Sequence, residues 1–337
     1  MVRLPPEIRD IAGQYVLLRI GNLRGVDLSI FDFDYDLAWY AFFLTPDGTA
    51  LGRFGGRDPD TPGKYHSLSA LRHSLASALA RFRRGEQASP ALRTSFRPED
   101  FPGAARLGDN ACIHCHHVHE FRRDLWQREK RWSLDDVWIY PQPENLGLTL
   151  DVERGDRILN VQPKSPAASL GLSAQDELRK IGVLPIASVA DVQYALHRTP
   201  KNSELPIEWR SGTELKKGVL KLPDHWRKTD VSWRWSLKTL APNPSLIGDD
   251  LDLTERKKLG LEPRQLAYRH MNFLTPTARH AGLQANDIIV GVGDQTMTMT
   301  ARQFETHIRL YHRVGDEITL NVLRGKERLK IKLKLPE

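Results

Sequence analysis

The sequence predicts an α+β multidomain protein, and three observations support this prediction. The chain has 337 residues, enough for about two to four compact domains that each bury a core. Apolar runs of strand length alternate with helical periodicities along the chain. One order of elements occurs twice, first after residue 145 and again after residue 258, which indicates an internal repeat.

Composition and charge exclude several classes of function. No run approaches the ~18 apolar residues that a membrane span needs, so we expect no transmembrane segment. Lys and Arg number 49 against 42 Asp and Glu, a net charge of +7. In residues 324–334, Leu329, Ile331 and Leu333 alternate with lysines, which is typical of a strand with one solvated face. No aromatic platform interrupts these charges, so we expect no nucleic-acid binding.

Residues 5–84 follow the order helix, strand, strand, strand, helix. An apolar run at 15–20 has strand length, and a hairpin is expected from strands at 39–44 and 50–54 around the turn Thr45-Pro46-Asp47-Gly48. A helix is expected to begin at Ser67 or Ser69. The sequence Phe42-Phe43-Leu44 with this turn and the final amphipathic helix resembles the second half of a thioredoxin fold.

This resemblance implies an incomplete thioredoxin-like α/β domain at 1–84. The strand and the Cys-x-x-Cys helix with which that family begins are missing, and Leu37-Ala38 stands where the family has Thr followed by cis-proline. We therefore expect that an N-terminal piece is lacking and that it would carry a signal peptide. The protein would then be periplasmic or otherwise exported, and it would be cytoplasmic if Met1 is the true start.

A connector is expected at 85–140, followed by two modules that share one set of motifs. Residues 141–224 contain Leu-Gly-Leu-Thr at 146–149, Ser-Pro-Ala-Ala at 165–168, Gly-Leu at 171–172, and a helix from 188 to 196. Residues 259–337 contain Leu-Gly-Leu at 259–261, Thr-Pro-Thr-Ala at 275–278, Ala-Gly-Leu at 281–283, and a helix from 301 to 311. Residues 225–258 lie between them.

Both sets of motifs resemble PDZ domains of the bacterial periplasmic protease type, which are small β-barrels. A PDZ groove binds a peptide C-terminus by strand addition. For the first module the resemblance implies a carboxylate-binding loop at Leu146, Gly147, Leu148 and Thr149, with Val192 and Leu196 facing the side-chain pocket. In the second module Glu262-Pro263 follows Gly260-Leu261, and this would repel a carboxylate and remove a donor. The predicted partners are therefore protein or peptide C-termini at the first module.

Both cysteines of the chain lie in one motif, Cys112-Ile113-His114-Cys115-His116. Two thiols three positions apart, followed at once by His, are the c-type haem attachment pattern. The thiols add to the haem vinyl groups and the imidazole binds the iron, so Cys112, Cys115 and His116 are the predicted haem c ligands. The distal iron ligand is open among His66, His73 and His119.

Other interpretations of this motif stay open. Zn or Cu could bind the two cysteines with two of His114, His116, His117 and His119. The thiols could also be redox-active, or form a strained disulfide. The Asp32, Asp34 and Asp36 series alternates with aromatic residues and suggests a half-buried strand or loop edge, with a cation site as the minority interpretation.

Taken together, the chain resembles bacterial proteins that join a thioredoxin-like domain to PDZ domains, some of which contain selenocysteine. The leading hypothesis is an exported peptide- or protein-binding adaptor with a c-type haem for electron transfer or redox sensing. One alternative is an enzyme, a thiol-disulfide oxidoreductase whose PDZ modules recruit substrates. The other is a metal-binding scaffold. Whether the chain is an enzyme stays open, and no catalytic residue is predicted.

Overall fold

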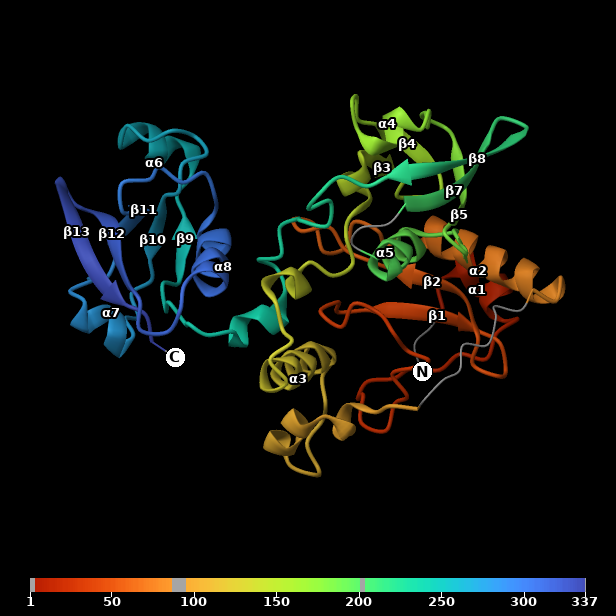
Figure 1. Cartoon of the computed structure of the whole chain (residues 1–337), viewed down its shortest axis with the longest axis horizontal. Coiled ribbons are helices and arrows are strands. Elements are labelled where there is room, and N and C mark those ends of the chain that lie inside the picture. Colours follow the sequence, from red (N-terminus) through yellow and green to blue (C-terminus); the bar gives the residue numbers. More distant parts are fainter. Residues whose placement is uncertain (1–3, 87–94, 201–203, 337) are drawn as a thin grey trace. The chain divides into compact units, whose positions relative to one another are not determined.

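The computed structural model describes residues 4–86, 95–200 and 204–336, and residues 87–94 of the predicted connector therefore lie outside it. The chain forms two compact units, residues 1–229 and 230–337 (Figure 1). The predicted thioredoxin-like part, connector and first module thus share one unit. None of the described helices is both long enough and apolar enough to cross a membrane.

The N-terminal part of the larger unit is a hairpin with two helices. Its elements are α1 (Pro6–Ala12), β1 (Tyr40–Leu44), β2 (Ala50–Gly55) and α2 (Leu68–Arg83). The antiparallel register places Ala41 opposite Phe54, as the hairpin prediction requires. Helix α2 begins where expected, because Ser67 Oγ accepts the Ala70 N–H at 3.0 Å. Phe43, Phe54 and Leu75 belong to one core cluster, which joins the hairpin to α2.

The strand predicted at residues 15–20 is wrong. This segment has no regular secondary structure and pairs with no described strand, and the Val16 side chain is 90% exposed. The sheet beside it contains only β1 and β2. Without a neighbouring strand, the backbone of an apolar run has no ladder to join, so β-propensity alone does not produce a strand.

The connector packs around one helix. Its described elements are the 3-10 turns η1 (Pro98–Asp100), η2 (Pro102–Leu107) and η3 (Leu134–Val137) and the helix α3 (Cys115–Arg128). Helix α3 begins at Cys115, inside the cysteine motif, with His114 as its N-cap. Ile113, Val118 and Phe121 are fully buried with Tyr35 in a separate core cluster.

The rest of the larger unit contains the first copy of the repeat. It has a two-stranded sheet, β3–β4, and a four-stranded sheet in the order β6-β5-β7-β8. Helix α5 packs against β5 and β6. The elements are η4 (Pro143–Leu146), β3 (Leu148–Leu150), β4 (Ile158–Val161), α4 (Pro166–Ser169), β5 (Glu177–Ile181), β6 (Leu184–Pro185), α5 (Val189–Arg198), β7 (Glu204–Ser211) and β8 (Glu214–Lys221).

The smaller unit contains the second copy, built on a five-stranded antiparallel sheet in the order β13-β12-β11-β10-β9. In β13, Ile331 and Leu333 are buried between exposed lysines, which confirms the predicted solvated strand face. The elements are η5 (Trp235–Thr239), β9 (Gly248–Asp250), α6 (Leu253–Lys258), β10 (Tyr268–His270), α7 (Pro276–His280), β11 (Ile288–Val292), α8 (Ala301–Tyr311), β12 (Glu317–Arg324) and β13 (Glu327–Lys334).

The second module begins earlier than predicted. Its sheet includes β9, and Leu246 belongs to its core cluster, so residues 246–258 are part of the module and not of a spacer. Pairing of β9 with β10 satisfies backbone groups that a free linker would leave to water.

The two copies share local hydrogen bonds as well as element order. Asp176 and Asp287 are both buried, and each accepts the backbone N–H of the residue three positions earlier. The residue before each of them, Gln175 and Asn286, has a positive φ. Two segments of different sequence therefore fold into the same turn.

A buried carboxylate links the N-terminal hairpin to the first copy. Asp191 of α5 accepts the backbone N–H groups of Arg53 in β2 and Ala187 at 3.1 and 3.2 Å. The neighbouring Ser188 hydroxyl donates to the Arg53 carbonyl at 2.6 Å. Figure 1 shows α5 beside β2, and side chains from both faces of α5 are buried.

We expect Asp191→Ala to lower the free energy of unfolding of the larger unit by about 2–4 kcal/mol. The substitution leaves two buried N–H groups without their acceptor, and each such group costs about 1–3 kcal/mol. Urea denaturation followed by tryptophan fluorescence measures the change. Glu214→Ala is the matched control, because the Glu214 side chain is 71% exposed, and it should change stability by less than about 0.5 kcal/mol. Equal effects of the two substitutions would contradict the proposed link.

The same carboxylate predicts a pH dependence. Burial raises the pKa of Asp191 to about 6, although Arg53 acts in the opposite direction. The folded protein therefore binds this proton more tightly than the unfolded chain, whose Asp pKa is about 3.9. The resulting stabilisation is fully present below about pH 4 and is lost as the pH rises through about 6. Between pH 4 and 7, wild type should lose up to about 3 kcal/mol relative to Asp191→Asn, whereas parallel profiles would contradict the shift.

Candidate functional site

The outer edge of the C-terminal sheet lies beside a helix. Strand β9 ends the strand order, so on its outer side it pairs with no strand that the structure describes. Helix α8 adjoins it, and the Ala301 N–H at the start of this helix donates to Asp250 Oδ1 of β9 at 2.9 Å. An open strand edge next to a helix can accept an extended peptide as an additional strand.

The loop before β9 offers backbone donors. Leu246 is 1% exposed and anchors the loop in the core, whereas the next residue, Ile247, is 52% exposed. Within the described parts of the chain, the N–H groups of Leu246 and Ile247 donate to no backbone acceptor. The Ile247 carbonyl accepts the Met271 N–H at 3.1 Å, which holds the loop against β10. Two adjacent N–H groups in a fixed loop can bind a carboxylate.

A buried arginine from α8 binds the segment that leads into this loop. Arg309 donates through Nη1 to the Leu240 carbonyl at 2.7 Å and through Nη2 to Asn243 Oδ1 at 3.0 Å. Its charge is compensated by Glu305, whose Oε1 lies 2.8 Å from Nη2. Because the guanidinium is a rigid planar donor group, it fixes the loop and the helix relative to each other.

By analogy with the first module, the sequence placed Gly260 and Leu261 in a carboxylate-binding loop, but the structure does not. They terminate helix α6: the Gly260 N–H donates to the Lys257 carbonyl at 3.1 Å and the Leu261 N–H to the Arg256 carbonyl at 2.9 Å. Gly260 has φ of +67°, as expected after a helix C-terminus. Since these donors are already used, the Glu262-Pro263 sequence after them does not obstruct a peptide site.

Sequence reasoning missed the Leu246–Gly248 loop for a physical reason. Helix α6 is inserted between β9 and β10, whereas only a short turn joins β3 to β4 in the first copy. The insertion contains a second Leu-Gly-Leu, at 259–261, which has the same sequence as the motif at 146–148 and was therefore aligned with it. The usable signal was the Leu-Ile-Gly sequence directly before the acidic pair Asp249-Asp250.

In the larger unit, the predicted carboxylate loop offers fewer donors than expected. Leu146 and Leu148 are fully buried. The Gly147 N–H donates to the Glu144 carbonyl at 2.9 Å, and the Gly147 carbonyl accepts from Gln162 next to β4. Thr149 lies opposite Asn160 in the β3–β4 ladder, so its backbone groups face β4, on the same side as those of Gly147. Only the Leu148 backbone faces away from that partner strand.

The predicted pocket residues of α5 are also buried. Val192 and Leu196 have no exposed surface and belong to the core cluster of the first copy. Gln193 on the same helix donates to the Arg57 carbonyl at 3.0 Å and to Gln142 Oε1 at 2.9 Å. The chain's own segments therefore cover the helix, and peptide binding at this module stays a prediction.

The cysteine motif lies at the start of α3. Cys112 is exposed in the preceding loop, which Arg24 holds by donating to the Gly108 carbonyl at 2.9 Å. Cys115 is the first helical residue and is half-buried, and this burial raises the pKa of its thiol. Both thiols are free. The more nucleophilic of the two under neutral conditions is therefore expected to be Cys112.

His116 is held in position by a carboxylate. Its Nδ1 lies 2.7 Å from Oε1 of the buried Glu120, one helical turn further on. Arg106 Nη2 donates to the other oxygen of Glu120 at 3.0 Å. A metal-binding histidine commonly donates its second ring nitrogen to a carboxylate in this way. The donor set of Cys112, Cys115 and His116 therefore fits the haem c pattern in residue type and support.

The alternative histidine ligands do not all gather at the cysteines. The His114 and His117 rings lie beside His116, with the centroids of His116 and His117 4.3 Å apart. His119 points elsewhere, because its Nε2 accepts the Tyr35 N–H at 3.1 Å and is buried. His119 therefore lies apart from the other predicted metal ligands.

His119 instead meets two residues of the aspartate series. Donor atoms of Asp34, Asp36 and His119 lie within 4.8 Å of one another, and this is the sole such group of three among the described residues. The series lies in a loop, one of the two predicted settings, with Asp32 and Asp36 half-buried and Asp34 buried. His119 Nε2 accepts the Tyr35 N–H, and this hydrogen bond joins the aspartate loop to α3.

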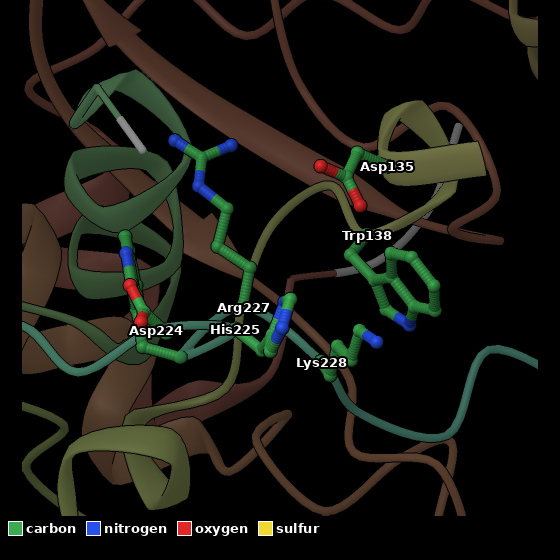
Figure 2. A pocket seen from close by; sticks show the side chains of 7 residues that line it. Asp135, Trp138, Asp224, His225, Arg227 and Lys228 are labelled. Carbon is green, nitrogen blue, oxygen red and sulfur yellow. The ribbon is translucent and has the colours of Figure 1, made fainter. Parts of the chain in front are cut away.

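One further pocket, of about 190 Å³, lies between η3 and the segment after β8 (Figure 2). Its lining combines acidic, basic and aromatic side chains, with Lys228 Nζ 5.0 Å from the centre of the Trp138 ring. It is smaller than the ~300–1,000 Å³ of pockets that hold drug-sized ligands. It contains none of the predicted site residues, which makes it a secondary feature. The lining residues are Asp135, Trp138, Asp224, His225, Trp226, Arg227 and Lys228.

Comparison with known families decides the nature of the C-terminal unit. Residues 267–335 match the family model of the PDZ domain. These residues form a PDZ domain. The match begins at β10, and β9 completes the sheet on the side where a ligand strand would add. No curated protein matches the chain. A PDZ domain is a peptide-binding module, so the role of this unit is recognition of a peptide or protein.

Proposed function

We propose that the protein is a peptide-binding adaptor whose C-terminal PDZ domain captures peptide C-termini beside β9. The observation that carries this proposal is the open edge of β9 next to α8, with the N–H groups of Leu246 and Ile247 at its start. The terminal carboxylate of the ligand would accept from these N–H groups. The ligand backbone would then pair with β9 as a sixth strand.

We further propose that residues 146–222 are a second PDZ domain and that the N-terminal hairpin with α2 is a partial thioredoxin-like domain. Support for the first part comes from the shared order of elements and from the equivalent Asp176 and Asp287 turns. Support for the second part is the β1–β2 hairpin followed by α2. With both parts, the architecture would be that of the bacterial thioredoxin-like and PDZ proteins, some of them selenoproteins, that the sequence resembles.

We expect fluorescently labelled peptides with a free C-terminus to bind the full chain, and the same peptides with a C-terminal amide to bind at least about tenfold more weakly. The carboxylate is the group that the loop N–H donors recognise. Ile247→Pro should lower affinity about tenfold or more, because proline removes one of those donors. Fluorescence anisotropy against a library of C-terminal sequences measures these affinities.

Ile247→Ala is the matched control, since it shortens the same side chain but keeps the N–H group. Its affinity should stay within about threefold of wild type. Equal binding of acid and amide peptides, or equal losses for the proline and alanine variants, would show that the loop is not a carboxylate site. Circular dichroism of both variants checks that the sheet is intact.

A second candidate function is a c-type haem site at Cys112, Cys115 and His116, which would place the protein outside the cytoplasm. The supporting observation is the Glu120 carboxylate 2.7 Å from His116 Nδ1. Bound haem would supply one-electron chemistry, with the two thiols as covalent attachment points. The thiol-disulfide and Zn or Cu alternatives use the same cysteines.

Protein made in a host that matures c-type cytochromes separates these alternatives. For a haem site we expect a Soret band that survives denaturation and solvent extraction and is lost in Cys112→Ser with Cys115→Ser. His116→Ala should retain the covalent haem but alter its spectrum. If no Soret band appears and both thiols titrate, the haem candidate is excluded. Alkylation should then be faster at Cys112, because burial raises the pKa of Cys115.

A further inference from the structure

We infer that Tyr65 is a built-in ligand of the first PDZ-like module and fills the pocket that would otherwise accept the last side chain of a bound peptide. This inference rests on the proposal that residues 146–222 are a PDZ domain. It assigns that module an internal partner, the chain segment 57–69, and leaves the C-terminal domain as the open receptor.

The packing of Tyr65 supports this inference. Its side chain is 3% exposed and belongs to the same core cluster as Leu146 and Leu148 of the loop and Val192 and Leu196 of α5. These four are among the six residues that the sequence assigned to the peptide site. An aromatic ring from more than 80 positions earlier in the chain is therefore part of the same buried cluster as the predicted peptide-site residues.

The polar end of Tyr65 is also held next to the loop. Its hydroxyl lies 3.5 Å from Glu144 Oε1, and Lys64 Nζ lies 3.7 Å from the same oxygen. Burial, with Glu144 as the next contributor, raises the pKa of Tyr65 to about 12, so the hydroxyl stays protonated as a donor. The pocket thus holds both the apolar body and the polar tip of the ring.

Residues on both sides of Tyr65 attach the segment to the two walls of the groove. Arg57 binds the helix wall through its carbonyl, which accepts from Gln193 of α5. On the strand side, Ser67 Oγ donates to the Val152 carbonyl at 3.1 Å and Ser69 Oγ to the Glu153 carbonyl at 3.3 Å. No described backbone ladder joins the segment to β3, so side chains hold it in place.

A glycine allows this close approach. Gly56 has φ of +99°, and a Cβ built there would lie 2.6 Å from Gln193 Oε1. Residues other than glycine rarely adopt this conformation. The chain can therefore pass directly over α5 before it reaches the Tyr65 pocket.

The second copy provides a natural contrast. Its equivalent apolar residues, Leu246 of the loop and Ile308 of α8, belong to one core cluster. In the described chain, that cluster contains no residue earlier than Leu246. The core cluster of the second copy therefore has no described counterpart of Tyr65, although residues 230–243 lie against α8 through hydrogen bonds such as Arg302 to Ser232 and Arg309 to Leu240.

The test is to remove the Tyr65 side chain and to add a ligand that could take its position. In the Ile247→Pro background, which removes the proposed C-terminal site, Tyr65→Ala should bind a labelled peptide ending in tyrosine at least about tenfold more tightly than the Tyr65 parent. The C-terminal amide of that peptide should show no gain. 4-Methylphenol, which has the shape of the tyrosine side chain, should raise the melting temperature of Tyr65→Ala but not of the parent.

Tyr311→Ala is the matched control, because this α8 tyrosine is 53% exposed and fills no pocket; it should gain no peptide binding. If Tyr65→Ala does not fold, Tyr65→Val is tested in the same way. Rescue by 4-methylphenol without any preference for the free-acid peptide would make Tyr65 an ordinary core residue and overturn the inference. Loss of binding in Ile247→Pro alone tests only the C-terminal domain, so the two failures are distinguishable.

Discussion

Helix α5 is packed between its own sheet and the N-terminal hairpin, and the larger unit depends on this packing. Asp191 and Ser188 connect the first turns of α5 to the Arg53 backbone in β2, while Val192 and Leu196 face the core of the first copy. A helix that covers only its own sheet would leave one face in water. Because α5 has partners on both sides, the hairpin and the first copy behave as one compact unit.

This constraint gives the two copies of the repeat different roles. Both have the same order of strands and helices and the same buried aspartate turn. In the first copy, the N-terminal chain covers the helix and places Tyr65 among the pocket residues. In the second copy, β9 remains an outermost strand and the loop before it keeps unused N–H donors. Under the proposals made above, a shared order of elements serves internal packing in one case and recognition in the other.

The cysteine motif lies in the larger unit, which also contains the first copy of the repeat. Its loop is held by Arg24, its second cysteine starts α3, and Glu120 orients the adjacent His116. The same helix uses its other side, through Phe121 and His119, to join the aspartate loop to the connector. Cys115 therefore lies at a helix terminus and Cys112 in a loop that Arg24 holds, a setting in which a ligand geometry can be maintained.

Local sequence determined much of this protein. The Ser67 cap predicted the start of α2, and the turn at 45–48 predicted the hairpin. The alternation in β13 predicted its buried and solvated faces, and the motifs after residue 258 predicted the C-terminal PDZ domain. These features were predictable because each signal depends on residues that are close in the sequence. Only the tertiary structure decided which loops have donors left, since α6 used those of Gly260 and Leu261 while β9 left those of Leu246 and Ile247. It alone brought Tyr65 to the predicted pocket residues and left residues 15–20 without a strand partner. These outcomes depend on contacts between distant parts of the chain, which periodicity and spacing do not encode.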